Sequence, residues 1–198
     1  FAVNAQTIAP YPLLSSLFRY GYLGVDLFFM ISGFVILMTA FSGSLRHFVL
    51  SRLVRLYPAF WICCTITFVA ILTIGSPDYV ATFSQYLVNM SMLSGFMDVE
   101  SIDNAYWSLF VELKFYALVA IVLLLGKVQQ IETLFIFWLV VTIALVIYPV
   151  FHLNFVLLDD YSAHFIAGAT FFFIWSRGMT RIRCLVIVAA WLCVLYQS

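Results

Sequence analysis

Charged residues are scarce in this 198-residue chain. Only 9% of its residues are Asp, Glu, Lys or Arg, whereas a soluble domain normally carries about 25%. Nine basic and nine acidic residues cancel, so the chain lacks the positive field that nucleic-acid binding requires. The composition therefore excludes an ordinary soluble domain and predicts no nucleic-acid partner.

Residues that bind metals are also few. The four cysteines are Cys63, Cys64, Cys184 and Cys193, and no pair has the C-x-x-C spacing of metal ligands. The three histidines are far apart and form no H-E-x-x-H pattern. We therefore expect the cysteines to be small buried hydrophobes, and we expect no metal and no bound cofactor.

What the chain has instead is apolar side chains: 65% of its residues are hydrophobic, and the mean hydropathy is +1.11. Apolar runs of about membrane length predict an all-α, polytopic transmembrane bundle in a lipid bilayer. About six spanning helices are expected, at 21–41, 57–75, 105–126, 133–150, 160–176 and 184–196. The chain begins at Phe1 and ends within the last apolar run. We therefore expect residues 1–198 to form a single transmembrane domain that is truncated at both ends.

Two further segments are too polar or too short to span. Residues 44–56 place leucines and a valine at three- and four-residue steps among arginines, which predicts a short amphipathic helix on the membrane surface. Pro58 would then begin the next helix. Residues 83–97 contain Ser, Gln and Asn, which favours a re-entrant or interfacial segment.

Charge placement predicts the orientation of the chain. Basic residues gather in 44–56, at Lys127 and in 177–183, whereas the connections 76–104 and 151–160 are acidic. Basic loops prefer the cytoplasmic side. We therefore place the 44–56 helix in the cytoplasm, and the helix 21–41 then runs from outside to inside.

Two acids lie within predicted spans, and both fall in the outer half of the membrane. Asp26 is either an interfacial carboxylate or one that lines a polar cavity. Glu112 shares a helix face with Ser108 and Tyr116 at four-residue steps, which suggests a cavity wall. The alternative for Glu112 is a simple ion pair inside the bundle, for which Lys114 is a candidate.

Three other residues are candidates for binding or catalysis. Arg52 and Arg55 are three residues apart and share a helix face, so they form either an anchor for anionic lipid or a phosphate clamp. His164 follows Asp160 by four residues, and such an Asp–His pair could act as a general base.

Three stretches, in this order, resemble hallmark segments of the acyltransferase-3 family: GVDLFFMISGFVI (24–36), RLVRLYP (52–58) and WSLFVELKFY (107–116). Members of this family are integral-membrane O-acyltransferases. They acylate bacterial lipopolysaccharide, peptidoglycan and exopolysaccharide, and relatives act on antibiotics and other small molecules. The resemblance implies acyl transfer to oxygen in a bacterial inner membrane, with a cell-envelope carbohydrate or a similar hydroxyl compound as acceptor.

The resemblance also implies roles for particular residues. Asp26 and Glu112 match the family's acids and are the candidate catalytic residues. Arg52 and Arg55 match its R-x-x-R pair, which is implicated with the acyl-CoA donor, usually acetyl-CoA. The candidate substrate-binding residues are Ser32, Trp107, Ser108 and Tyr116.

One element of the family pattern is missing. The family's first helix carries a basic residue and, about three helical turns later, a histidine taken as the catalytic base. No such helix precedes Gly21, which is a further reason to expect a fragment. The alternatives are a non-catalytic acyltransferase remnant and a transporter or lipid flippase. The internal repeat typical of many transporters is not seen.

Overall fold

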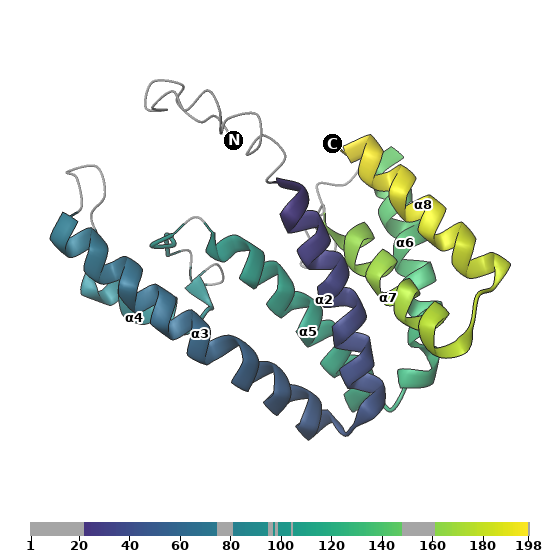
Figure 1. The fold of residues 1–198 in the computed structure, drawn as a ribbon, viewed down its shortest axis with the longest axis horizontal. Helices are drawn as coiled ribbons and strands as arrows, with labels where there is room; N and C mark the ends of the chain where they lie inside the picture. Colours follow the sequence, from purple (N-terminus) through teal and green to yellow (C-terminus); the bar gives the residue numbers. More distant parts are fainter. Residues whose placement is uncertain are drawn as a thin grey trace.

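The computed structural model describes residues 22–74, 81–94, 97, 99–103, 105–147 and 161–197. Within these ranges the chain folds into α-helices without any β-strand (Figure 1), which confirms the expected all-α class. The helices are α2 (Tyr22–Ser42), α3 (Leu45–Ile74), α4 (Phe83–Met90), α5 (Tyr106–Leu124), α6 (Ile131–Ile147), α7 (Ser162–Arg177) and α8 (Arg181–Gln197). A 3-10 turn, η2 (Val128–Gln130), leads into α6.

Four stretches of the described chain are long and apolar enough to cross a membrane: Leu23–Ser42, Leu45–Ile74, Tyr106–Leu124 and Val128–Ile147. They establish an integral membrane protein. The remaining long helices, α7 and α8, have 16 and 17 residues. A straight crossing needs about 20 residues, so the expected count of six spans stays a prediction.

The predicted division between a surface helix at 44–56 and a spanning helix at 57–75 is wrong. The structure has one continuous helix of 30 residues, α3, with Pro58 inside it. A proline removes one backbone N–H and bends a helix. A complete break in an apolar environment would leave many more backbone groups without partners. The amphipathic segment is therefore the first part of a helix that is about 45 Å long.

The segment 83–97 forms a short capped helix followed by a turn. The Thr82 side chain accepts a hydrogen bond from the Gln85 backbone N–H (3.2 Å), and the Gln85 side chain accepts one from the Thr82 backbone N–H (3.4 Å). This reciprocal pair forms a capping box. The segment is tied to α3, because the Trp61 indole N–H donates to the Met90 carbonyl oxygen (3.0 Å). Whether it is re-entrant or interfacial stays a prediction.

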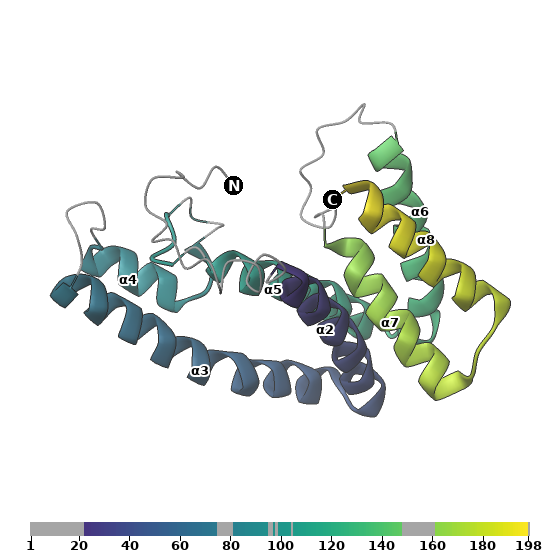
Figure 2. The ribbon, with the colours of Figure 1, turned by 45° about the horizontal axis from the view of Figure 1, so that its top comes forward.

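Helix α7 lies between α2 on one side and α6 with α8 on the other (Figures 1 and 2). All its residues from 162 to 170 are buried. Gly33 of α2 and Gly168 of α7 make this crossing unusually close. A Cβ atom on Gly33 would overlap the Phe165 carbonyl oxygen, and one on Gly168 would overlap the Met30 carbonyl oxygen. The two backbones are therefore in direct contact.

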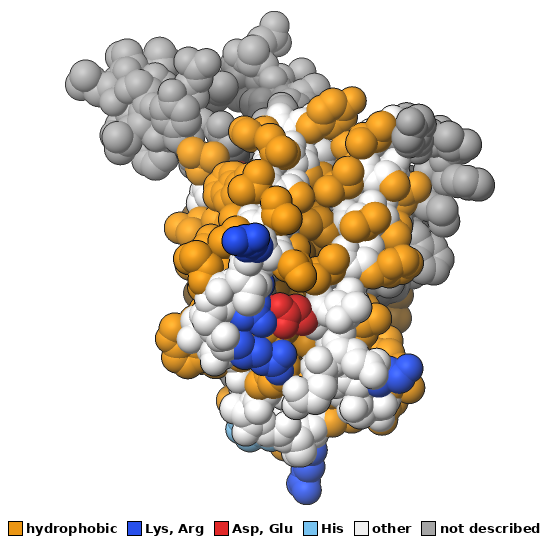
Figure 3. All heavy atoms as spheres, turned by 90° about the vertical axis from the view of Figure 1, so that its right-hand side faces the viewer, with side chains coloured by type: hydrophobic (Ala, Val, Ile, Leu, Met, Phe, Trp, Pro, Cys, Tyr) orange, Lys and Arg blue, Asp and Glu red, His pale blue; other side chains and the backbone are white. Residues whose placement is uncertain are grey.

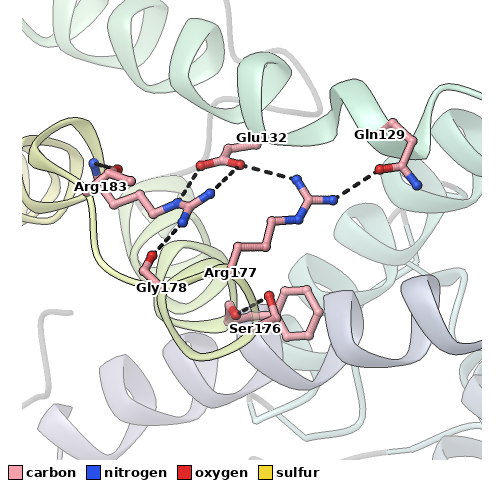
Figure 4. A network of polar contacts seen from close by, with 8 residues as sticks. Gln129, Glu132, Ser176, Arg177, Gly178 and Arg183 are labelled. Carbon is pink, nitrogen blue, oxygen red and sulfur yellow. Dashed lines mark hydrogen bonds and ion pairs between the residues drawn. The ribbon is translucent and has the colours of Figure 1, made fainter.

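The connections between α2 and α3, between α5 and α6 and between α7 and α8 lie at one end of the bundle (Figure 1), and Arg46, Lys127 and Arg177 lie in or beside them. Contacts tie this end together. Arg177 lies over the rings of Phe41 and Phe173, and Arg177 and Arg183 both pair with Glu132 (Figure 4). Figure 3 shows acidic and basic side chains gathered within a mostly hydrophobic face. We call the end of the bundle that holds these three connections the basic end. Its cytoplasmic location stays a prediction.

Candidate functional site

Glu112 on α5 is only 4% exposed. Its Oε1 atom accepts hydrogen bonds from the Ser32 hydroxyl (2.7 Å) and from the Tyr116 hydroxyl (2.7 Å). Its Oε2 atom is buried and has no hydrogen-bond partner among the described residues. The site therefore holds a carboxyl group that is fixed at one oxygen and open to a further donor at the other.

Arg52 on α3 borders the same group. It is 6% exposed, and one of its terminal nitrogens donates to the Thr39 hydroxyl on α2. Its guanidinium carbon lies 5.6 Å from the centre of the Tyr116 ring and 6.0 Å from that of Phe48, within the range of a cation–π interaction. Arg52 thus contacts the Glu112 cluster through Tyr116. Thr39 is a residue that the sequence did not single out.

Two cavities lie beside α5, and Glu112 itself is in the lining of neither. The first is about 360 Å³, lies between α3 and α5, and is lined mainly by apolar side chains together with Arg52, Lys114 and Tyr116. The second is about 530 Å³ and lies among α2, α3 and α5. Its polar lining includes Arg55, Asp103 and Ser108. We call them the α3/α5 cavity and the α2/α3/α5 cavity.

The two arginines of the predicted clamp therefore face different cavities. Arg52 is buried against α2 and α5, whereas Arg55 is exposed and lines the α2/α3/α5 cavity. A step of three residues turns a helix by about 300°, which separates the two side chains by about 60° around the axis. Leu56 lines both cavities, so they adjoin at that side chain.

Trp107 and Ser108 lie near the start of α5, away from the basic end. The Ser108 hydroxyl donates to the Ala105 carbonyl oxygen (3.0 Å). The Trp107 ring centre lies 5.1 Å from that of Tyr161 and 6.1 Å from that of Phe29. Trp107 is thus part of an aromatic group that joins α2, α5 and the start of α7.

Asp26 belongs to this same end of the bundle, and its partner is His164. The Asp26 Oδ1 atom lies 3.5 Å from the His164 Nε2 atom, and the side chains are 25% and 7% exposed. Asp160, which the sequence predicted as the partner of His164, lies outside the described residues. Sequence spacing could not find the observed pair because its members are on different helices. The one available signal was that each is a polar residue near the same end of an apolar helix.

The described residues include no group of three or more His, Cys, Asp or Glu side chains arranged to hold a metal ion. The cysteines are all free. Cys64 and Cys193 are buried as expected, whereas Cys63 and Cys184 are exposed on the helix surfaces.

A chain whose described residues form helices of membrane length around a buried, hydroxyl-bound carboxyl group is a polytopic membrane protein with a polar site inside its bundle. Residues 4–197 match the model of the family described as an acyltransferase domain, so the chain belongs to the acyltransferase-3 family. This confirms the family inferred from the three motifs. The protein is a membrane acyltransferase that transfers groups other than amino-acyl groups. No curated protein and no solved structure matches the chain.

Proposed function

We propose that this protein moves an acyl group, most simply acetyl, from acyl-CoA to a hydroxyl of a cell-envelope carbohydrate in a bacterial inner membrane. The observation that carries this proposal is the position of Glu112 on α5 between two residues that line different cavities. Tyr116 lines the α3/α5 cavity, Ser108 lines the α2/α3/α5 cavity, and Glu112 lies one helical turn from each on α5. A transferase needs two substrates to meet at one point, and this arrangement supports such a meeting.

The α3/α5 cavity suits the donor. Its mainly apolar lining can receive an acyl chain or the pantetheine arm of coenzyme A. Arg52 and Lys114 supply positive charge for phosphate groups. Arg55 is a second candidate phosphate contact, because Leu56 borders both cavities and the two spaces adjoin there. The donor would enter from the basic end, which we place in the cytoplasm because basic loops prefer that side.

The α2/α3/α5 cavity suits the acceptor. Phe28, Phe60 and Tyr106 provide ring faces against which a sugar can pack, and Asp103 and Ser108 provide hydrogen-bonding groups. Trp107 and Ser32 are further candidate contacts, since Ser32 is bonded to Glu112 and Trp107 directly precedes Ser108. The unpartnered Oε2 atom of Glu112 is free to accept a hydrogen bond from an acceptor hydroxyl.

The chemistry is nucleophilic attack on a thioester. A base removes the proton of the acceptor hydroxyl, the oxygen bonds to the thioester carbonyl carbon, and the carbon–sulfur bond breaks. Hydroxyl groups and a carboxyl group in a buried site hold the reacting oxygen in place. Asp26 and Glu112 are the catalytic candidates in this scheme, and residues 1–198 act as one transmembrane domain.

The test follows a labelled acetyl group. Membranes from cells that express the protein, and matched membranes that lack it, are incubated with radiolabelled acetyl-CoA. We expect label to enter the carbohydrate fraction of the expressing membranes only, and mild alkali to release it as acetate because the product is an oxygen ester. Equal labelling of the two membranes, or label that resists alkali, would overturn the proposal.

The orientation of the donor is tested with sealed vesicles. Inside-out vesicles should use added acetyl-CoA, and right-side-out vesicles should not, because the basic end is assigned to the cytoplasm. The opposite preference would reverse the assignment of donor and acceptor sides.

A further inference from the structure

Arg52 is a buried cation without a carboxylate partner among the described residues. It is 6% exposed, and the ion pairs found in the described part of the chain involve other residues. Its Nε atom is buried and has no hydrogen-bond partner there either. A buried charge without a counter-charge destabilises a protein, and charged side chains inside a membrane protein mark binding sites. Arg52 therefore has the capacity to bind a negatively charged ligand.

The Thr39 hydroxyl on α2 holds one end of the Arg52 guanidinium. A terminal nitrogen of Arg52 donates to the Thr39 hydroxyl oxygen. The hydrogen of this hydroxyl is donated to the Val35 carbonyl oxygen, one turn earlier on α2 (2.9 Å). A hydroxyl has one hydrogen, so the Thr39 oxygen can only accept from Arg52. Thr39 is 8% exposed and β-branched, which restricts its side-chain torsion and fixes the acceptor in place.

Two aromatic rings hold the guanidinium from other directions. Its carbon lies 6.0 Å from the Phe48 ring centre and 5.6 Å from the Tyr116 ring centre. Arg52 also lines the α3/α5 cavity, which the proposed function assigns to the donor. An arginine side chain has many rotamers and loses that freedom when it binds a ligand. Contacts that fix the guanidinium beforehand reduce this loss, so the site is preorganised for an anionic ligand.

One face of α2 carries the partners of both ionisable side chains in the site. Ser32 and Thr39 are seven residues apart, which is about two turns, so they lie on the same face about 10 Å apart along the helix. The Ser32 hydroxyl bonds Glu112, and the Thr39 hydroxyl bonds Arg52. Thr39 therefore has the same relation to Arg52 that Ser32 has to Glu112.

We propose that Thr39 is a positioning residue for the acyl donor, because it holds the Arg52 guanidinium in the orientation that binds negatively charged acyl-CoA. This inference rests on the proposed function, in which Arg52 contacts the donor. Thr39 is in the lining of neither cavity, so it acts through Arg52 and not by touching a substrate. The alternative is a tether between α2 and α3 that supports the fold and has no effect on donor affinity.

The first test measures equilibrium binding of radiolabelled acetyl-CoA to the purified protein in detergent, together with acetyl transfer. Thr39→Val keeps the shape of the side chain but removes the hydroxyl, and it should weaken donor binding about five- to tenfold, as expected for the loss of one hydrogen bond. The apparent KM for acetyl-CoA should rise by the same factor, whereas the maximal rate and the acceptor KM should not change. Thr39→Ser keeps the hydroxyl and should bind the donor with nearly unaltered affinity.

The matched control is Thr170→Val. Thr170 on α7 is buried, as Thr39 is, and its hydroxyl donates to the Ile166 carbonyl oxygen of its own helix (2.7 Å). Within the described residues this hydroxyl has no contact with an arginine. Thr170→Val should therefore leave donor affinity unchanged. Melting in detergent shows whether each variant is folded.

The second test asks whether Thr39 acts through Arg52. In an Arg52→Gln background, Thr39→Val should weaken donor binding no further, because the two substitutions remove the same interaction. An equal loss in the Arg52→Gln and the unaltered backgrounds would show that Thr39 acts independently of Arg52, and this would overturn the inference.

Other outcomes also decide the matter. Unaltered donor affinity in both Thr39→Val and Thr39→Ala overturns the inference, and so does an equal loss in Thr39→Ser and Thr39→Val. Loss of folding in both hydroxyl-free variants would establish the structural tether instead. Unaltered donor affinity in Arg52→Gln, or the absence of acetyl-CoA binding by the unaltered protein, would contradict the proposed function itself.

Discussion

Two glutamates in apolar surroundings differ in how completely they are bonded. Glu132 begins α6 at the basic end, and both its carboxylate oxygens are bound by Arg183, at 2.7 and 3.0 Å; Arg177 also lies 3.5 Å from Oε2 (Figure 4). Glu112 is more deeply buried, yet within the described part of the chain only its Oε1 atom is bonded, and the donors are two neutral hydroxyls. One carboxylate is saturated by cations, and the other retains a free oxygen.

This difference separates a structural role from a chemical one. Glu132 joins α6 to α7 and α8, because it pairs with Arg177, the last residue of α7, and with Arg183 in the first turn of α8. Arg177 also donates a hydrogen bond to the Gln129 side chain (3.1 Å). The bidentate pair with Arg183 holds both carboxylate oxygens on a cation, so neither oxygen is left without a partner. An incompletely bonded carboxyl group costs stability and persists where function requires it. The contrast predicts that the two glutamates respond in opposite ways to the same substitution.

The largest effect is expected at Glu112. Glu112→Gln should reduce acetyl transfer by about 100-fold or more, because the amide keeps the shape but lacks the charge and proton affinity of the carboxylate. Stability should change little, since a neutral amide is easier to bury than an ion. Transfer rate and melting in detergent are measured together. A stable and fully active Glu112→Gln protein would remove Glu112 from the site.

The second effect is on stability. Glu132→Gln leaves Arg183 with an unpaired charge and should lower the free energy of unfolding by about 2–3 kcal/mol, less than for a fully buried pair because Glu132 is 24% exposed. Transfer by the protein that remains folded should be unchanged. Glu100→Gln is the matched control, because residue 100 is exposed. Loss of activity without loss of stability in Glu132→Gln would contradict the purely structural role of Glu132.

The third prediction asks whether Arg52 binds the acyl donor beside Glu112 or only anchors the basic end to lipid. Arg52→Lys keeps the charge but loses the guanidinium fork, and should raise the apparent KM for acetyl-CoA by about tenfold, or about 1.5 kcal/mol. Arg55→Lys should have a smaller effect, because Arg55 lines the other cavity. Arg46→Lys, an exposed change on the same helix, is the control. An unaltered donor KM in both Arg52→Lys and Arg55→Lys would favour the lipid-anchor interpretation.

The smallest effect is expected from removing one hydroxyl of the Glu112 cluster. Ser32→Ala leaves Tyr116 as the donor to Oε1 and should reduce transfer by a factor that corresponds to about 1 kcal/mol. Ser42→Ala on the same helix removes a hydroxyl bonded only to the Thr39 carbonyl oxygen, and it should leave transfer unchanged. Equal rates in these two variants would indicate that Ser32 does not tune Glu112.

Helical spacing in the sequence predicted contacts within one helix but not between helices. Glu112 and Tyr116, four residues apart, were predicted to share a face, and their hydrogen bond confirms this. The Ser32–Glu112 bond spans 80 residues, and the Asp26–His164 contact joins α2 to α7. Periodicity specifies which side chains share a helix face, but it does not specify which faces of separate helices meet.

The error at Pro58 has a related cause. We predicted that Pro58 begins a new helix, because proline in soluble proteins is common in the first turn of a helix and rare inside one. In α3 the chain continues through it for 16 more residues, because an apolar environment strongly favours internal bonding of every other backbone group. The apolar composition that predicted membrane helices was therefore also the reason to expect a longer α3.

The close approach of Gly33 to the Phe165 backbone and of Gly168 to the Met30 backbone fixes the point where α2 and α7 cross. No side chain separates the backbones at this point, so sliding of one helix along the other would drive carbonyl oxygens into the neighbouring backbone. Asp26 lies about 10 Å from this point towards one end of α2, and Phe41 lies about 12 Å towards the other. A rocking of α7 about this point that widened the gap between Asp26 and His164 would press Arg177 against Phe41, and the two ends of the bundle would then be coupled.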